Sequence, residues 1–160
     1  MTEIWENLVI VGMGNPLLSD DGVGHHAARA LGSAFPGSAV HTIPMIGMDL
    51  LDLIDGFHSL CLVDAMTTGT VPIGTVKRFP LPGPGLHSCS SHGPDLQSVL
   101  SLGHALNLNI PRTTLLYGIE IGTEIPFGED LTPSLQRCFK TAVRQIDMGV
   151  KSLLTWGSNL

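Results

Sequence analysis

The first apolar run of the sequence, Leu8-Val-Ile-Val-Gly-Met13, constrains the fold more than any other feature. An unbroken run of β-branched and other apolar residues is typical of a strand buried on both faces of a sheet. A strand with one face in water alternates apolar and polar residues instead. Doubly buried strands occur in α/β proteins, where helices cover both faces of the sheet. The run therefore predicts the first strand of an α/β sheet.

Apolar runs and helical spacing alternate along the rest of the chain. We expect strands over residues 8–13, 40–43, 60–66, 74–79 and 113–121, and helices over residues 22–35, 48–57, 92–106 and 132–154. The connection between the third and fourth strands is too short for a crossover helix, so the fourth strand should run antiparallel to the third. We predict one domain over residues 1–160, a three-layer α/β sandwich in which a mixed, twisted sheet of about five strands has helices on both faces.

Composition and charge exclude several classes of protein. The chain has 8 basic and 14 acidic residues among its 160, and the basic ones are scattered, so nucleic acid is not expected as a partner. The apolar runs are shorter than the ~18 residues that a membrane-spanning helix needs. Residues 1–6 carry acid where a secretory leader carries base, and the 3 cysteines form no Cys-x-x-Cys pair. We expect a cytoplasmic protein with free thiols that acts as a monomer.

Two carboxylates and one imidazole are predicted to meet at one edge of the sheet. Asp21 lies in the loop after the first strand, and Asp64 lies at the end of the third. His92 lies where a long Pro- and Gly-rich loop leads into the next helix. Ligands bind open α/β sheets at the carboxyl ends of the strands, and an O,O,N set suits a divalent transition metal with positions left open for a substrate. The alternative is structural: Asp21 caps a helix, Asp64 accepts backbone hydrogen bonds in a turn, and His92 caps the third helix.

A nucleotide site is a weaker hypothesis for the same loop. Gly12-Met-Gly14 after a strand is how a dinucleotide-binding fingerprint begins. However, Leu17 stands where the third glycine belongs, and Asp20 and Asp21 would place negative charge where a pyrophosphate meets a helix N-terminus.

Other residues have lower-ranked roles. Cys89 could be a nucleophile or a fourth ligand, but no cationic residue lies near it in the sequence, so we expect a bystander. His25 and His26 are expected to support the site rather than to bind metal. Asn15 is expected to fix its loop by hydrogen bonds to the backbone, and Gly24 to allow close backbone approach.

Three segments resemble the hydrogenase maturation proteases: residues 12–24 (GMGNPLLSDDGVG), residues 62–65 (LVDA) and residues 90–96 (SSHGPDL). These enzymes trim the C-terminus of the large subunit of nickel-iron hydrogenases. By motif position, Asp21, Asp64 and His92 correspond to the residues of the family that contact the metal. The resemblance therefore implies a hydrolase, an endopeptidase of aspartic or metal-dependent type, with these three residues at its catalytic and metal site.

The resemblance also implies the partner and the metal. The partner would be a nickel-loaded hydrogenase large-subunit precursor, and the Ni²⁺ would come with this substrate, with Zn²⁺ or Cd²⁺ able to substitute in vitro. One segment departs from the family pattern, because Pro44-Met45-Ile46 stands where a Gly-Gly-Thr turn is common. That loop is expected to touch substrate.

Two other functions remain open from the sequence. Gly14-Asn15-Pro16 after a strand also resembles peptidyl-tRNA hydrolase, although the acidic net charge of −6 argues against a tRNA substrate. A non-catalytic, nickel-binding accessory protein could use the same three residues. Cleavage of a nickel-loaded precursor by the purified protein would separate these functions.

Overall fold

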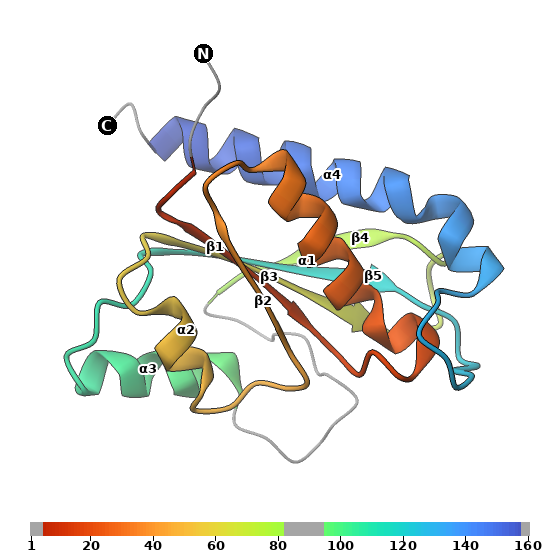
Figure 1. Cartoon of the computed structure of the whole chain (residues 1–160), viewed down its shortest axis with the longest axis horizontal. Coiled ribbons are helices and arrows are strands. Elements are labelled where there is room, and N and C mark those ends of the chain that lie inside the picture. Colours follow the sequence, from red (N-terminus) through yellow and green to blue (C-terminus); the bar gives the residue numbers. More distant parts are fainter. Residues whose placement is uncertain (1–4, 82–94, 158–160) are drawn as a thin grey trace.

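Over residues 5–81 and 95–157, which the computed structural model describes, a five-stranded mixed sheet forms the middle layer of the molecule (Figure 1). The elements follow in the order β1 Leu8–Met13, the 3₁₀ turn η1 Ser19–Gly22, α1 Val23–Ala34, β2 Ala39–Ile43, α2 Leu50–Ile54, β3 Ser59–Met66, β4 Val76–Phe79, α3 Leu96–Ala105, β5 Thr113–Glu120 and α4 Pro133–Gly157. The predicted α/β class and mixed sheet are confirmed.

The strand order is β2-β1-β3-β5-β4. The first four strands in this order are parallel, and β4 pairs antiparallel with β5. The expected direction of β4 relative to β3 is therefore right, although β5 lies between them. The carboxyl ends of four strands consequently lie along one edge of the sheet.

Helices cover the two faces in pairs, α1 and α4 on one face and α2 and α3 on the other (Figure 1). Successive side chains of β1 enter different cores: Ile10 packs with α1 and α4, and Val9 and Val11 pack with α2 and α3. All six residues of β1 are buried. This two-sided burial is the physical reason for the unbroken apolar run.

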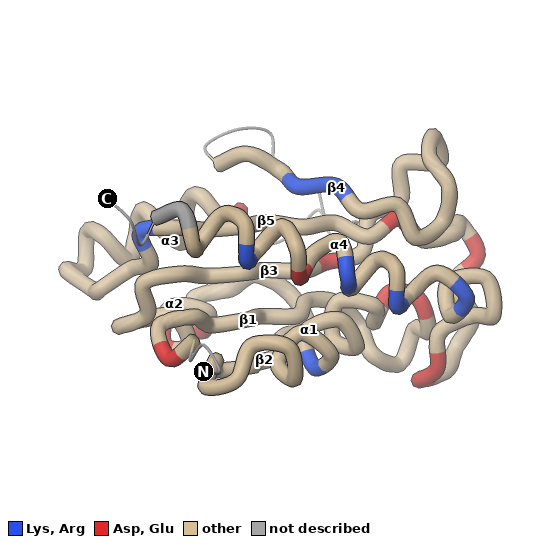
Figure 2. The backbone as a smooth tube through the Cα atoms, turned by 90° about the horizontal axis from the view of Figure 1, so that it is seen from above, with Lys and Arg blue, Asp and Glu red and all other residues tan. Residues whose placement is uncertain are grey.

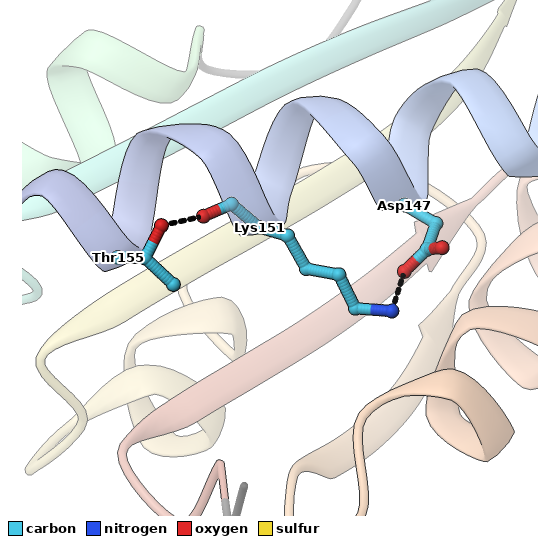
Figure 3. A network of polar contacts seen from close by, with 3 residues as sticks. All are labelled: Asp147, Lys151 and Thr155. Atoms are coloured by element: carbon cyan, nitrogen blue, oxygen red, sulfur yellow. Dashed lines mark hydrogen bonds and ion pairs between the residues drawn. The ribbon is translucent and has the colours of Figure 1, made fainter.

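The long helix α4 is amphipathic and carries an ion pair beside the end of α1. Lys151 Nζ lies 2.8 Å from Asp147 Oδ1, one turn away, and the Thr155 hydroxyl donates to the Lys151 carbonyl (Figure 3). Lys151 Nζ also lies 5.3 Å from the ring centre of Phe35, which follows α1. Such exposed contacts contribute about 0.5 kcal/mol each, so the buried face of α4 dominates its stability. None of the described helices is long and apolar enough to cross a membrane.

The predicted starts of α1 and α3 are wrong in detail. The N-cap of α1 is Gly22, with no side-chain cap hydrogen bond, so Asp21 does not cap this helix. The third helix starts at Leu96 rather than near residue 92, because Asp95 is a good N-cap: its Oδ1 accepts a hydrogen bond from Ser98 N at 2.8 Å.

Helix α1 lies unusually close to the sheet. A Cβ on Gly24 would overlap the backbone oxygens of Met13 and Val63, and a Cβ on Gly12 would overlap the backbone oxygen of Gly24. Only glycine permits these contacts, so the expected close approach at Gly24 is confirmed. As a result, the start of α1 lies on the ends of both β1 and β3.

Gly24→Ala tests this packing. The added methyl group must push α1 away from β1 and β3, so we expect the free energy of unfolding to fall by about 3 kcal/mol, measured by urea denaturation. Gly122→Ala is the control, because its Cβ would meet only the end of the Ile73 side chain, at 3.4 Å. Equal stability of the two variants would contradict the close-packing argument.

Candidate functional site

The candidate site lies at the carboxyl edge of the sheet, where η1 contacts the end of β3. Asp21 belongs to η1 and Asp64 to β3. Asp64 experiences the negative charge of Asp21. The structure therefore brings together two of the three predicted site residues, and the glycine contacts of α1 are what holds η1 beside β3.

Asp64 is a buried carboxyl group with one oxygen unused. Its side chain is only 4% exposed. Oδ1 accepts a hydrogen bond from Ala65 N at 2.8 Å, whereas Oδ2 is buried and has no hydrogen-bond partner among residues 5–81 and 95–157. A buried acceptor without a partner costs stability, so a native protein that retains one commonly uses it for function.

Burial is the main cause that raises the pKa of Asp64, from its ordinary value of 3.8 to about 7. The hydrogen bond from Ala65 N opposes this effect, and the negative charge of Asp21 adds to it. Asp64 can therefore exchange a proton near neutral pH, which a general base or a metal ligand must do.

Asp21 is half-buried and is held by its own loop. Its Oδ2 accepts a hydrogen bond from Asn15 N at 2.9 Å. Asn15 is itself fixed, because its Oδ1 accepts a hydrogen bond from Leu17 N at 3.0 Å. The expected loop-fixing role of Asn15 is thus confirmed, and it positions the Asp21 carboxylate.

Asp20, the neighbour of Asp21, has a different role. It is 2% exposed, and its two oxygens accept hydrogen bonds from the amide and the hydroxyl of Thr132, each at 2.7 Å. Thr132 immediately precedes α4. Asp20 therefore ties η1 to the start of α4 and has both oxygens occupied.

The two histidines of α1 also have structural partners. His25 is buried, with Nε2 at 3.0 Å from the backbone oxygen of Ile43, and His26 Nε2 lies 3.1 Å from the backbone oxygen of Glu129. His25 connects α1 to the end of β2, and His26 connects it to the loop that follows β5. This agrees with their expected supporting role.

Glu120 is a third buried acid at this edge that the sequence analysis did not select. It ends β5, opposite Met66 of β3, and is 1% exposed. Its Oε1 accepts hydrogen bonds of 2.9 Å each from Thr68 N, Thr68 Oγ1 and Gly69 N. Glu120 thereby fixes the loop that follows Asp64. The available signal was an acid at the end of an apolar strand, the same signal that singled out Asp64.

His92 and Cys89 lie outside the described residues. Among residues 5–81 and 95–157, no group of three His, Cys, Asp or Glu side chains could hold a metal ion. Asp64 and Asp21 nevertheless fit part of a metal site, since Oδ2 of Asp64 is an unused carboxylate oxygen and carboxylates bind divalent ions. A third ligand would have to come from elsewhere.

No protein-family model matches the sequence, and no curated protein matches it significantly. Solved structures do match. The hydrogenase maturating endopeptidase HybD from E. coli has a TM-score of 0.69 at 22% sequence identity, covering 91% of this chain and 92% of that one. The NiFe hydrogenase maturation protease HycI from Thermococcus kodakarensis KOD1 has a TM-score of 0.66 at 20% identity, covering 89% and 91%.

The chain has the fold of the hydrogenase maturation proteases. HybD from Thermococcus kodakarensis agrees, with a TM-score of 0.59 at 21% identity, covering 88% of this chain and 97% of that chain. The maturation-protease fold thus accounts for most of the chain, which confirms the fold that the sequence resemblance implied.

Asp64→Asn tests the burial of the Asp64 charge. The folded protein binds a proton at Asp64 up to about pH 7, whereas the unfolded chain releases it near pH 4, so wild-type stability falls as pH rises between these values. Asparagine does not titrate. We therefore expect the stability of Asp64→Asn relative to wild type to increase by a few kcal/mol, at most about 4, from pH 4 to pH 7.

Urea denaturation of metal-free protein at several pH values measures this difference. Asp52→Asn, which alters an exposed carboxylate on α2, is the matched control and should follow the wild type. Parallel pH profiles for wild type and Asp64→Asn would contradict the raised pKa.

Proposed function

We propose that this chain is a hydrogenase maturation endopeptidase, which removes the C-terminal extension of a nickel-iron hydrogenase large-subunit precursor after nickel insertion. The observation that carries the proposal is Oδ2 of the buried Asp64 beside Asp21, which has no partner in the described part of the chain and lies at the ligand-binding edge of a maturation-protease fold. The sequence resemblance at residues 12–24 supports the same function. We expect the protein to act in the cytoplasm as a monomer.

In this mechanism, nickel arrives as part of the substrate. Asp21, Asp64 and His92 would bind the nickel of the precursor and so bring the neighbouring peptide bond to the carboxyl edge of the sheet. Binding requires Asp64 to lose its proton, which a pKa of about 7 permits at neutral pH.

Water would then attack the carbonyl carbon of that bond, and the nickel of the substrate would supply the polarisation that lowers the barrier. One carboxylate takes the proton from the water and returns it to the leaving amine.

Cleavage of a nickel-loaded precursor by purified protein tests the function. We expect Asp21→Asn, Asp64→Asn and His92→Ala each to lower the cleavage rate by at least about 100-fold, because each removes a group that binds the substrate metal. Cleavage is followed by mass spectrometry of the released C-terminal peptide.

Two matched controls accompany these variants. Asp20→Asn should have a milder effect, since it leaves an acceptor for Thr132 N, and Cys89→Ser should keep most activity because the mechanism needs no thiolate. A wild-type rate in Asp64→Asn would overturn the proposed site. Precursor binding without cleavage by the wild type would support the accessory-protein alternative instead.

Metal binding to the free protein gives a second test. The wild type should bind Ni²⁺ weakly and lose it to a chelator without unfolding, because the proposed site has only three protein ligands. Its affinity should fall up to about tenfold per pH unit below pH 7, as Asp64 is protonated, with further loss where His92 is protonated. Calorimetric titration at pH 5–8 measures this. Equal affinities for wild type, Asp64→Asn and His92→Ala would contradict the nickel-recognition mechanism.

A further inference from the structure

Most of the exposed large apolar side chains that the structure describes lie on loops at the carboxyl edge of the sheet. They are Leu17 after β1, Met45 and Met48 after β2, Val71 and Ile73 after β3, and Ile125 and Phe127 after β5. Three others, Leu106, Met148 and Leu153, lie on or at the ends of helices. Exposed apolar residues that gather around a candidate site mark an interaction surface.

Leu17 and Phe127 lie on two loops that are hydrogen-bonded to each other. Gly128 N donates to the Leu17 oxygen at 2.9 Å, and Ser19 N donates to the Gly128 oxygen at 2.7 Å. Leu17 is 55% exposed and Phe127 90% exposed. We call this pair of side chains the apolar ledge.

The backbone next to the apolar ledge, at Ser19, has an energetically unfavourable conformation. Ser19 has φ of 45°, which is unfavourable for a residue other than glycine. The Ser19 hydroxyl donates to the Asp130 oxygen at 2.6 Å, and Asp20 next to it binds Thr132. These bonds fix the two loops together, so the ledge is preorganised and loses little freedom when a partner binds.

The apolar ledge adjoins the candidate site through a short hydrogen-bonded chain. Leu17 N donates to Asn15 Oδ1, and Asn15 N donates to Asp21 Oδ2. A molecule whose reacting group is at Asp21 and Asp64 would therefore reach Leu17 with its neighbouring parts.

We propose that the apolar ledge formed by Leu17 and Phe127 is a docking site for the protein substrate, where it receives an apolar side chain of the precursor. This inference rests on the proposed function and adds a specificity-determining contact outside the nickel site. Large apolar and aromatic side chains that are fully covered on binding contribute most of the affinity at protein interfaces.

Charge identifies the kind of surface that fits. The loops of this edge, residues 14–22, 44–49, 67–74 and 121–132, contain no Lys or Arg, and Figure 2 shows acidic positions in the loops beyond β5. Glu124, Glu129 and Asp130 flank the apolar ledge in sequence. The complementary surface therefore has an apolar side chain surrounded by Lys or Arg. A second copy fits poorly, because a symmetric contact would place these acids opposite one another.

Cleavage kinetics with Phe127→Ser and Leu17→Ser test the proposal. Each variant should raise KM for the nickel-loaded precursor by about tenfold, with a much smaller change in kcat, because the contact is made equally by the bound substrate and by the transition state. Both side chains are exposed, so the melting temperature should stay near that of the wild type. Leu106→Ser is the matched control, because Leu106 is also 55% exposed but caps the end of α3.

Each outcome has a definite meaning. If the wild type cleaves and KM is unchanged in Phe127→Ser and Leu17→Ser, the docking proposal for the apolar ledge is wrong and the proposed function stands. If the wild type does not cleave, the proposed function fails, and the docking proposal is then tested by calorimetric measurement of precursor binding. Weaker binding of the precursor by both variants supports the docking site, and binding equal to that of the wild type overturns it. A wild-type dimer in sedimentation that Phe127→Ser dissociates would assign the ledge to a second copy and overturn the proposal.

Discussion

The close contact of α1 with the sheet is the constraint on which the candidate site depends. Gly24 lies against the backbone of Met13 and Val63, a spacing that a Cβ would prevent. This contact places η1 at the ends of β1 and β3, and it sets Asp21 near Asp64. A wider helix-to-sheet distance would leave two separate carboxylates with no common site.

Three buried acids at the carboxyl edge of the sheet, Asp20, Asp64 and Glu120, differ in how many of their oxygens accept hydrogen bonds. Asp20 and Glu120 have their oxygens occupied by Thr132 and by Thr68 and Gly69, and both fix loops around the site. Asp64 alone among them has a buried oxygen that no described part of the chain bonds. The occupied acids provide rigidity, and the unused oxygen is the position that we propose for binding the substrate metal.

The same two hydrogen-bonded loops, after β1 and after β5, position both the candidate site and the apolar ledge. Asp20 and Ser19 tie the loop after β1 to the segment before α4, and the same segment presents Phe127. Under the proposed function, affinity at the apolar ledge would help to hold the cleavable bond at the candidate site.

The sequence by itself determined the fold class, because an unbroken apolar run at β1 is stable only between two helical layers. It also selected Asp64, an acid that ends an apolar strand, and the resemblance at residues 12–24 selected Asp21 in the loop after the first strand. Only the tertiary structure gave the physical difference between Asp20 and Asp21, which are identical in type and adjacent, because the partner of Asp20, Thr132, is distant in sequence. The role of Glu120 and the joining of Leu17 with Phe127 were decided in the same way, by contacts between loops that no local pattern encodes.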